Sequence, residues 1–176
     1  MRISYFAYGS NMLSKRLQKR VPSANPIGKG VLEGFVLQTN KLSRDGSSKC
    51  NVMMKENKVV HGVLFSIDAG ERALLDKAEG LGHGYEICEA DILCAQRVIP
   101  AFFYIAQEEH RGMAEPFEWY MNFARAGAHE HMLPLFYQQW LRDWKCQRDF
   151  DTQRREGNRD IIREAQLTQA EGFDWF

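Results

Sequence analysis

The stretch Tyr5-Phe6-Ala7-Tyr8-Gly9-Ser10-Asn11-Met12 decides the fold prediction. A short apolar strand beginning at Ile3 turns sharply at Gly9 and continues into a helical pattern. Ser10 or Asn11 is a suitable N-cap, because a short side-chain oxygen accepts a free N–H of the first helical turn. A strand–glycine–helix junction points unpaired backbone N–H groups at one place and can hold a phosphate or a carboxylate. On this stretch alone, an ordinary tight turn is the simpler interpretation.

The composition favours one domain with a sizeable core, since 44% of the 176 residues are hydrophobic. A formal net charge of zero argues against nucleic acid or an anionic membrane surface as the main partner. The N-terminus lacks a signal-peptide pattern and no segment reaches transmembrane length, so a cytoplasmic location is expected. The four cysteines, which form no CxxC pair, are expected to be free thiols without a metal: Cys50, Cys88, Cys94 and Cys146.

Glycine-punctuated apolar segments predict bent strands, because a glycine inside a strand marks a bulge or strong curvature. The remaining apolar runs separate into strands with alternating or β-branched residues and helices with apolar residues on one face. The predicted strands are 27–37, 50–54, 59–67, 85–98 and 101–106, the last two joined near Pro100. The predicted helices are 68–79, 116–126 and one beginning at Leu133-Pro134 whose apolar side uses Leu135, Phe136, Trp140, Leu141 and Trp144.

The character of the chain changes near residue 143, which predicts one domain over 1–142 and a charged tail over 143–176. Within the tail, 159–170 is consistent with an amphipathic helix. We expect the tail to dock on the domain or on a partner subunit, because Trp175 and Phe176 are costly to leave in water. A partly disordered tail is the alternative interpretation.

Glu79 is the most informative candidate for chemistry. It is in the last turn of the helix predicted over 68–79, where Asp68 and Glu71 resemble a capping box and Gly80 is in the position of a helix-ending glycine. The negative end of the helix dipole, Asp76 three residues earlier and an apolar neighbour would each raise the pKa of Glu79. A carboxylate near neutrality suits a general acid/base. A surface glutamate beside a helix-ending glycine explains the position equally well.

Two other patterns give weaker signals. Ser10 is not expected to be a nucleophile, because Tyr8-Gly9-Ser10-Asn11 lacks the second glycine of a Gly-x-Ser-x-Gly elbow. His129 and His131 are two residues apart, but in a loop between helices a solvated pair is favoured over a zinc site.

Taken together, several motifs in this order resemble the γ-glutamylcyclotransferase family. The similarity covers about Ile3 to Trp140, and the residues that carry it are Tyr5 to Asn11, Gly62 to Phe65, Leu75 to Gly80, Tyr85, Tyr120, Gly127-Ala128 and Leu133-Pro134. The resemblance implies a mixed α+β fold, a small closed β-barrel flanked by helices.

The resemblance also implies an activity, the cyclisation of a γ-glutamyl group to 5-oxoproline with release of an amino acid or amine. Glu79 falls on the general acid/base. Tyr8, Gly9, Ser10 and Asn11 fall on the loop that binds the γ-glutamyl head, and Tyr85 and Tyr120 fall on or near tyrosines that shape the pocket. No metal or cofactor is expected, the partner is a small γ-glutamyl compound, and family habit suggests a homodimer.

Three alternatives stay open at this point. The enzyme could release amines from γ-glutamyl-amines, or remove a γ-glutamyl group in a biosynthetic pathway, with glutathione a further candidate substrate. The third alternative is a non-catalytic γ-glutamyl binding module of the same fold.

Overall fold

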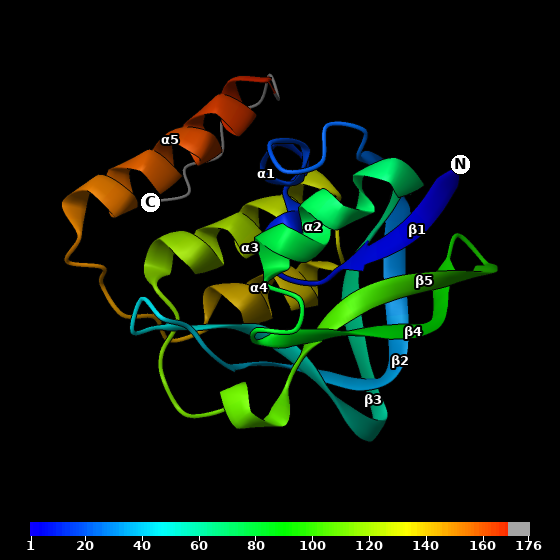
Figure 1. Cartoon of the computed structure of the whole chain (residues 1–176), viewed down its shortest axis with the longest axis horizontal. Helices are drawn as coiled ribbons and strands as arrows, with labels where there is room; N and C mark the ends of the chain where they lie inside the picture. The colour runs from blue at the N-terminus through cyan, green and yellow to red at the C-terminus, as the bar shows by residue number, and fades with distance from the viewer. Residues whose placement is uncertain (169–176) are drawn as a thin grey trace.

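A computed structural model describes residues 1–168, and it has at its centre a closed five-stranded barrel with the order β1-β3-β2-β4-β5 (Figure 1). Parallel pairing of Tyr5 with Phe102 closes the barrel between β1 and β5, and the other neighbours are antiparallel. The strands are β1 (Arg2–Ala7), β2 (Asn25–Leu42), β3 (Ser48–Asp68), β4 (Tyr85–Cys94) and β5 (Arg97–Ala106). The prediction of a mixed α+β fold with a small closed barrel is confirmed.

The first long hairpin is bent, as the glycines predicted, but it is made of fewer strands. β2 and β3 pair along most of their length, with register shifts after Pro26, Glu33 and Gln38. Gly34, at φ 75°, lies at the second shift. The prediction of separate strands over 50–54 and 59–67 is wrong, because the exposed polar residues 55–58 form a bulge opposite Gly34 inside one continuous strand.

The second hairpin turns earlier than predicted. Ala95 and Gln96, with φ values of 47° and 65°, connect β4 to β5, while Pro100 lies inside β5 opposite Asp91. Two consecutive residues with positive φ match the twist of a tight hairpin. Residues 95 and 96 are not the usual Asn-Gly or Gly-Gly pair of such a turn. Pro100 therefore did not mark the turn between the two strands.

Helices gather on one side of the barrel (Figure 1). The α-helices are α1 (Ser14–Gln18), α2 (Arg72–Glu79), α3 (Glu118–Glu130), α4 (Leu135–Arg142) and α5 (Thr152–Thr168), and single 3-10 turns are η1 (Ser10–Met12), η2 (Ala69–Glu71) and η3 (Glu108–His110).

The ends of α2 follow the sequence prediction in part. Gly80 ends it in the left-handed conformation at φ 71°, as predicted. Asp68 accepts from the Gly70 N–H at 2.8 Å, but Glu71 accepts from the Ser23 N–H at 2.9 Å and does not reach back to Asp68. The second half of the capping box is therefore wrong, because Glu71 connects this turn to the segment before β2.

The apolar side predicted for α4 is also wrong in most of its members. Leu135, Phe136 and Trp140 are 83%, 68% and 40% exposed, whereas Tyr137 and Leu141 are buried. Tyr137 and Leu141 are four residues apart and therefore share the face that packs inward. Hydropathy alone could not distinguish this face from the exposed one.

The segment after α4 contacts the rest of the molecule. The buried Asp149 carboxylate accepts from Trp119 Nε1 at 2.8 Å and pairs with Arg154. Helix α5 begins before the predicted 159–170, packs on α1 and α3, and buries Ile162 (Figure 1). The predicted helix end, Trp175 and Phe176 lie outside the described residues, and the division into a domain over 1–142 and a tail stays a prediction.

Within residues 1–168, no helix is both long enough and apolar enough to cross a membrane.

Gly127 in α3 permits the close approach of the turn that follows β1. A Cβ at this position would lie 2.4 Å from the backbone N of Leu13 and 2.4 Å from the backbone C of Met12. We expect Gly127→Ala to lower the free energy of unfolding by about 3 kcal/mol, because neither backbone atom can move aside cheaply. Equilibrium denaturation measures this loss.

Gly157 in α5 supplies the matched control, since a Cβ there would meet nothing within 4 Å. Gly157→Ala should leave stability unchanged or raise it by about 0.5–1 kcal/mol, because alanine favours a helix interior over glycine. Equal effects of the two substitutions would contradict the packing described here.

Candidate active site

One small cavity brings together every residue that the sequence singled out as catalytic or substrate-binding. It is lined by Tyr8, Gly9, Ser10, Asn11, Glu79, Tyr85 and Tyr120, together with Tyr5, Cys50 and Tyr104. These last three were not among the site residues predicted from the sequence, although Tyr5 begins the motif that carries the family resemblance. The cavity volume is about 30 Å³, room for about one water molecule.

The barrel and the helices each contribute to the cavity. Residues 8–11 leave the end of β1, Cys50 is near the start of β3, Glu79 ends α2 and Tyr120 is on α3. A Cβ on Gly9 would lie 2.9 Å from Cys50 Cβ and 3.3 Å from the Tyr120 hydroxyl. Glycine is therefore required here for close approach between the loop after β1 and strand β3.

The Glu79 carboxylate is held by two side chains. Glu79 Oε1 accepts from Asn11 Nδ2 at 2.9 Å and from Arg20 Nη1 at 2.5 Å. Arg20 also donates to Asn11 Oδ1 at 3.0 Å, and Asn11 Nδ2 lies 3.0 Å from the Tyr5 hydroxyl. The three side chains therefore form a closed triangle at the edge of the cavity, in which each contacts the other two.

This triangle corrects two sequence expectations. Neither Ser10 nor Asn11 caps a helix, because Leu13 precedes α1 and no side-chain cap is present, and Asn11 is directed to Glu79 instead. The sequence also missed Arg20, which contributes a cation to surroundings predicted to be only negative and apolar. No sequence signal connects residues that are 59 positions apart.

Asp76 is not the like-charged neighbour of Glu79 that the helix pattern suggested. Its Oδ1 accepts from Arg72 Nε at 3.0 Å and from the Tyr104 hydroxyl at 2.6 Å. Asp76, inside α2, thus accepts hydrogen bonds from a cation and a phenol. The bond from Tyr104 attaches the helix to strand β5.

Two tyrosines hold the backbone of Cys50. The Tyr120 hydroxyl accepts from the Cys50 N–H at 2.9 Å, and the Tyr85 hydroxyl donates to the Cys50 carbonyl at 2.7 Å. Cys50 lies in the irregular part of the β2–β3 ladder, between the pairs Gln38–Asn51 and Lys41–Lys49. A bulge leaves backbone groups without a ladder partner, and here the site tyrosines satisfy them.

Burial keeps the phenols and the thiol of the cavity wall uncharged. Burial raises the pKa of the Tyr5, Tyr8, Tyr85 and Tyr120 hydroxyls, so each is a neutral phenol at physiological pH. Burial likewise raises the pKa of the Cys50 thiol to about 12. A thiol with such a pKa is inert as a nucleophile, which leaves Glu79 as the ionisable group suited to proton transfer at the cavity.

The structure also shows the surroundings of Ser10, considered as a nucleophile, and of His131, considered as a metal ligand. Ser10 lines the cavity, and within the described part of the chain no hydrogen bond joins it to a histidine. His131 is not solvated as expected, because its Nε2 lies 3.1 Å from Ser14 Oγ and burial lowers its pKa. Among residues 1–168, no three His, Cys, Asp or Glu side chains form a metal-binding group; the absence of a cofactor stays a prediction.

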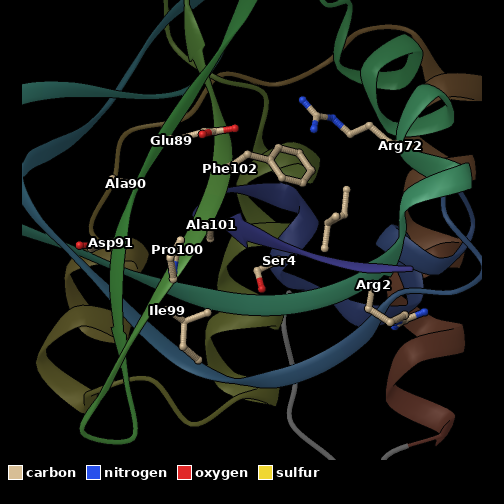
Figure 2. Close-up of a pocket in the computed structure, with 11 residues that line it drawn as sticks. Arg2, Ser4, Arg72, Glu89, Ala90, Asp91, Ile99, Pro100, Ala101 and Phe102 are labelled. Atoms are coloured by element: carbon tan, nitrogen blue, oxygen red, sulfur yellow. The ribbon is translucent and has the colours of Figure 1, made fainter.

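A larger hollow of about 750 Å³ lies elsewhere, between β1 and the β4–β5 hairpin (Figure 2). Figure 2 shows Arg2 and Arg72 on one side of it and Glu89 and Asp91 on the other. Arg2 donates to the Ser66 and Ser23 carbonyls, and Arg72 pairs with Asp76. Since both cations already have structural partners, the smaller cavity is the stronger candidate for the active site.

The hydrogen bonds of Tyr120 to Cys50 and of Tyr104 to Asp76 predict different losses of stability on Tyr→Phe substitution. Tyr120→Phe leaves a buried N–H without its acceptor and should cost about 1–3 kcal/mol in the free energy of unfolding. Tyr104→Phe should cost less, about 1 kcal/mol, because Asp76 keeps its bond from Arg72 and its side chain is 23% exposed. Denaturant titration of both variants measures the difference, and equal losses would contradict these assignments.

Comparisons with known proteins agree with this geometry. A family model described as the AIG2-like family matches residues 59–141. The human gamma-glutamylcyclotransferase is 28% identical over 145 residues, which cover 78% of this chain and 76% of the relative. A putative gamma-glutamylcyclotransferase of Bacillus subtilis is 34% identical over 82 residues, 45% of this chain and 29% of the relative.

A solved structure of a gamma-glutamyl cyclotransferase superposes with a TM-score of 0.84 at 27% identity, covering 93% of this chain and 99% of that one. The barrel order, the placement of the motif residues around one cavity and these similarities all agree. The chain is similar in sequence to γ-glutamylcyclotransferases and has their fold.

Proposed function

We propose that this protein is a γ-glutamylcyclotransferase-type enzyme that converts the γ-glutamyl group of a small compound to 5-oxoproline. The observation that carries the proposal is the position of Glu79. Glu79 lines both the tyrosine-lined cavity and a wider groove of about 560 Å³. A γ-glutamyl head in the cavity and a leaving group in the groove would place the scissile amide beside Glu79.

The reaction needs one group that accepts a proton and later returns it. The substrate α-amine must be neutral to attack the γ-carbonyl carbon, so Glu79 would take its proton as the ring C–N bond forms. The amide C–N bond to the leaving group then breaks, and Glu79 would return the proton to the departing nitrogen. A single carboxylate can perform both steps in turn. Because this chemistry is acid–base throughout, we propose that it is independent of metals and cofactors.

Polar groups for the γ-glutamyl head come from the loop after β1. The first N–H groups of a helical turn have no partner within the turn, which applies to Ser10 and Asn11 in η1. These donors and the Ser10 hydroxyl suit the α-carboxylate or the developing oxyanion. The phenols of Tyr5 and Tyr8 add neutral dipoles to the wall.

The small volume of the cavity implies a change on binding. A space of about 30 Å³ does not hold a γ-glutamyl head. The side chains around it must therefore move apart, and the side chain of Arg20, which bonds both Glu79 and Asn11, is the one whose movement would open the edge of the cavity. Release of Glu79 from this cation would also free the carboxylate to accept a proton.

The alternatives differ from this proposal in the leaving group or in the absence of reaction. A γ-glutamyl-amine or biosynthetic γ-glutamyl substrate would use the same head site. A binding module would have no need of a carboxylate between the two spaces, which is why we favour an enzyme. Action in the cytoplasm and assembly as a homodimer stay predictions.

Release of 5-oxoproline tests the proposal. The purified protein is incubated with γ-glutamyl-alanine, a γ-glutamyl-amine and glutathione, and the product is quantified by mass spectrometry. We expect release from at least one compound and a loss of about 100-fold or more in Glu79→Gln, the range typical of a lost general acid/base.

Glu89→Gln is the matched control, since Glu89 lines the larger hollow and not the cavity. It should retain the wild-type rate, and circular dichroism should show all variants folded. An unchanged rate in Glu79→Gln would contradict the catalytic assignment, and the absence of product from every compound would favour a binding module.

A further inference from the structure

The groove beside Glu79 carries an unusual charge. Its lining includes three side chains that are cationic at neutral pH, Lys41, Arg44 and Lys77, and two histidines, His83 and His110. The one acidic side chain in the lining is Glu79 itself, which is paired with Arg20. The groove therefore has a surplus of positive charge next to the proposed site of chemistry.

Within the described residues, none of these cations has an acidic hydrogen-bond partner. Among residues 1–168, the side chains of Lys41, Arg44 and Lys77 make no hydrogen bond or ion pair with the protein. Asp45 acts electrostatically on Lys41, but it bonds to Lys49 at 2.8 Å and to Ser47; these contacts outweigh burial and hold the pKa of Asp45 at about 2. Asp45 is thus already compensated by a different lysine.

Lys41 connects the groove to the inner cavity. Its Nζ lies 5.1 Å from the ring centroid of Tyr85, whose hydroxyl holds the Cys50 carbonyl at the cavity wall. Half-burial lowers the pKa of Lys41, while the nearby Glu79 carboxylate raises it. Lys41 is therefore within electrostatic reach of the catalytic candidate and stands where a leaving group would emerge.

The end of helix α2 opposes anion binding only weakly. Its C-terminal carbonyls would repel a carboxylate, but those of Asp76 and Lys77 accept from the Leu81 and Gly80 N–H groups at 2.9 and 3.2 Å. Full charges on three side chains outweigh the remaining partial charges of one helix end.

We infer that this groove binds an acidic leaving group, an amino acid or short peptide with a carboxylate in addition to its α-carboxylate. The inference rests on the proposed function and specifies its substrate class. Lys41 would pair with one carboxylate of the leaving group. Arg44 and Lys77 would then be left to pair with a second carboxylate. A volume of about 560 Å³ leaves room for a side chain or further residue.

An isosteric pair of substrates isolates the charge. γ-Glutamyl-glutamate and γ-glutamyl-glutamine have nearly the same size and differ by one negative charge at neutral pH. We expect kcat/KM for 5-oxoproline release to be about 10-fold higher for the glutamate compound, mainly through a lower KM, because a charge-assisted contact replaces a neutral one. The preference should shrink as ionic strength rises.

Single substitutions assign the preference to residues. Lys41→Gln and Lys77→Gln should each reduce the ratio of the two kcat/KM values several-fold. Lys58→Gln removes an exposed charge from β3 outside the groove lining and should leave the ratio at the wild-type value. Lys77 is exposed on α2, so its variant tests the inference even if Lys41→Gln proves unstable.

The outcomes separate the inference from the proposed function. Product from both compounds with a ratio near one overturns the acidic leaving group and leaves the cyclotransferase proposal intact. A ratio that persists in both lysine variants overturns the assignment to this groove. No product from either compound, nor from γ-glutamyl-alanine, a γ-glutamyl-amine or glutathione, overturns the proposed function and the inference with it.

Discussion

The hydrogen-bonded triangle of Glu79, Asn11 and Arg20 joins three parts of the molecule that are distant in sequence. Asn11 belongs to the turn after β1, Arg20 follows α1, and Glu79 ends α2. Gly80 ends α2 directly after Glu79, so Glu79 is the last residue of the helix. The close packing of η1 on Gly127 fixes the other side of the triangle. The position of Glu79 between cavity and groove depends on these contacts.

An irregularity in the β2–β3 ladder of the barrel also supports the candidate site. The register shift after Gln38 leaves Cys50 outside the regular ladder, and Tyr85 and Tyr120 take over its backbone groups. Two hydroxyls of the site are therefore committed to structure, whereas Ser10 lines the same cavity without such a contact to Cys50. The two spaces also differ in charge: neutral phenols surround the inner cavity, whereas the outer groove is lined by cations that form no ion pair within residues 1–168. Such a division suits a substrate that has a compact head and an anionic remainder.

Sequence reasoning succeeded where a local rule or a motif applied. Bent strands followed from Gly34 and its neighbours, and the end of α2 followed from Gly80. The residues chosen for the site lie around one cavity, and their roles stay predictions. It failed where pairing between distant segments decides the outcome. Arg20, Tyr5 and Cys50 enter the site through tertiary contacts that no spacing reveals, and Leu135 and Phe136 are exposed because helix packing, not hydropathy, sets the inward face of α4. The β4–β5 turn was misplaced because Ala95 and Gln96 adopt positive φ without the usual turn residues.

A crystal structure of Glu79→Gln with γ-glutamyl-glutamate bound tests the central claim most directly, namely that Glu79 separates a head cavity from a leaving-group groove. The account predicts that the γ-glutamyl head lies among Tyr8, Ser10 and Asn11, with the scissile amide next to residue 79 and the leaving carboxylates near Lys41. A ligand bound instead in the hollow between β1 and β5, or one with its head in the groove and its leaving group in the cavity, would contradict it.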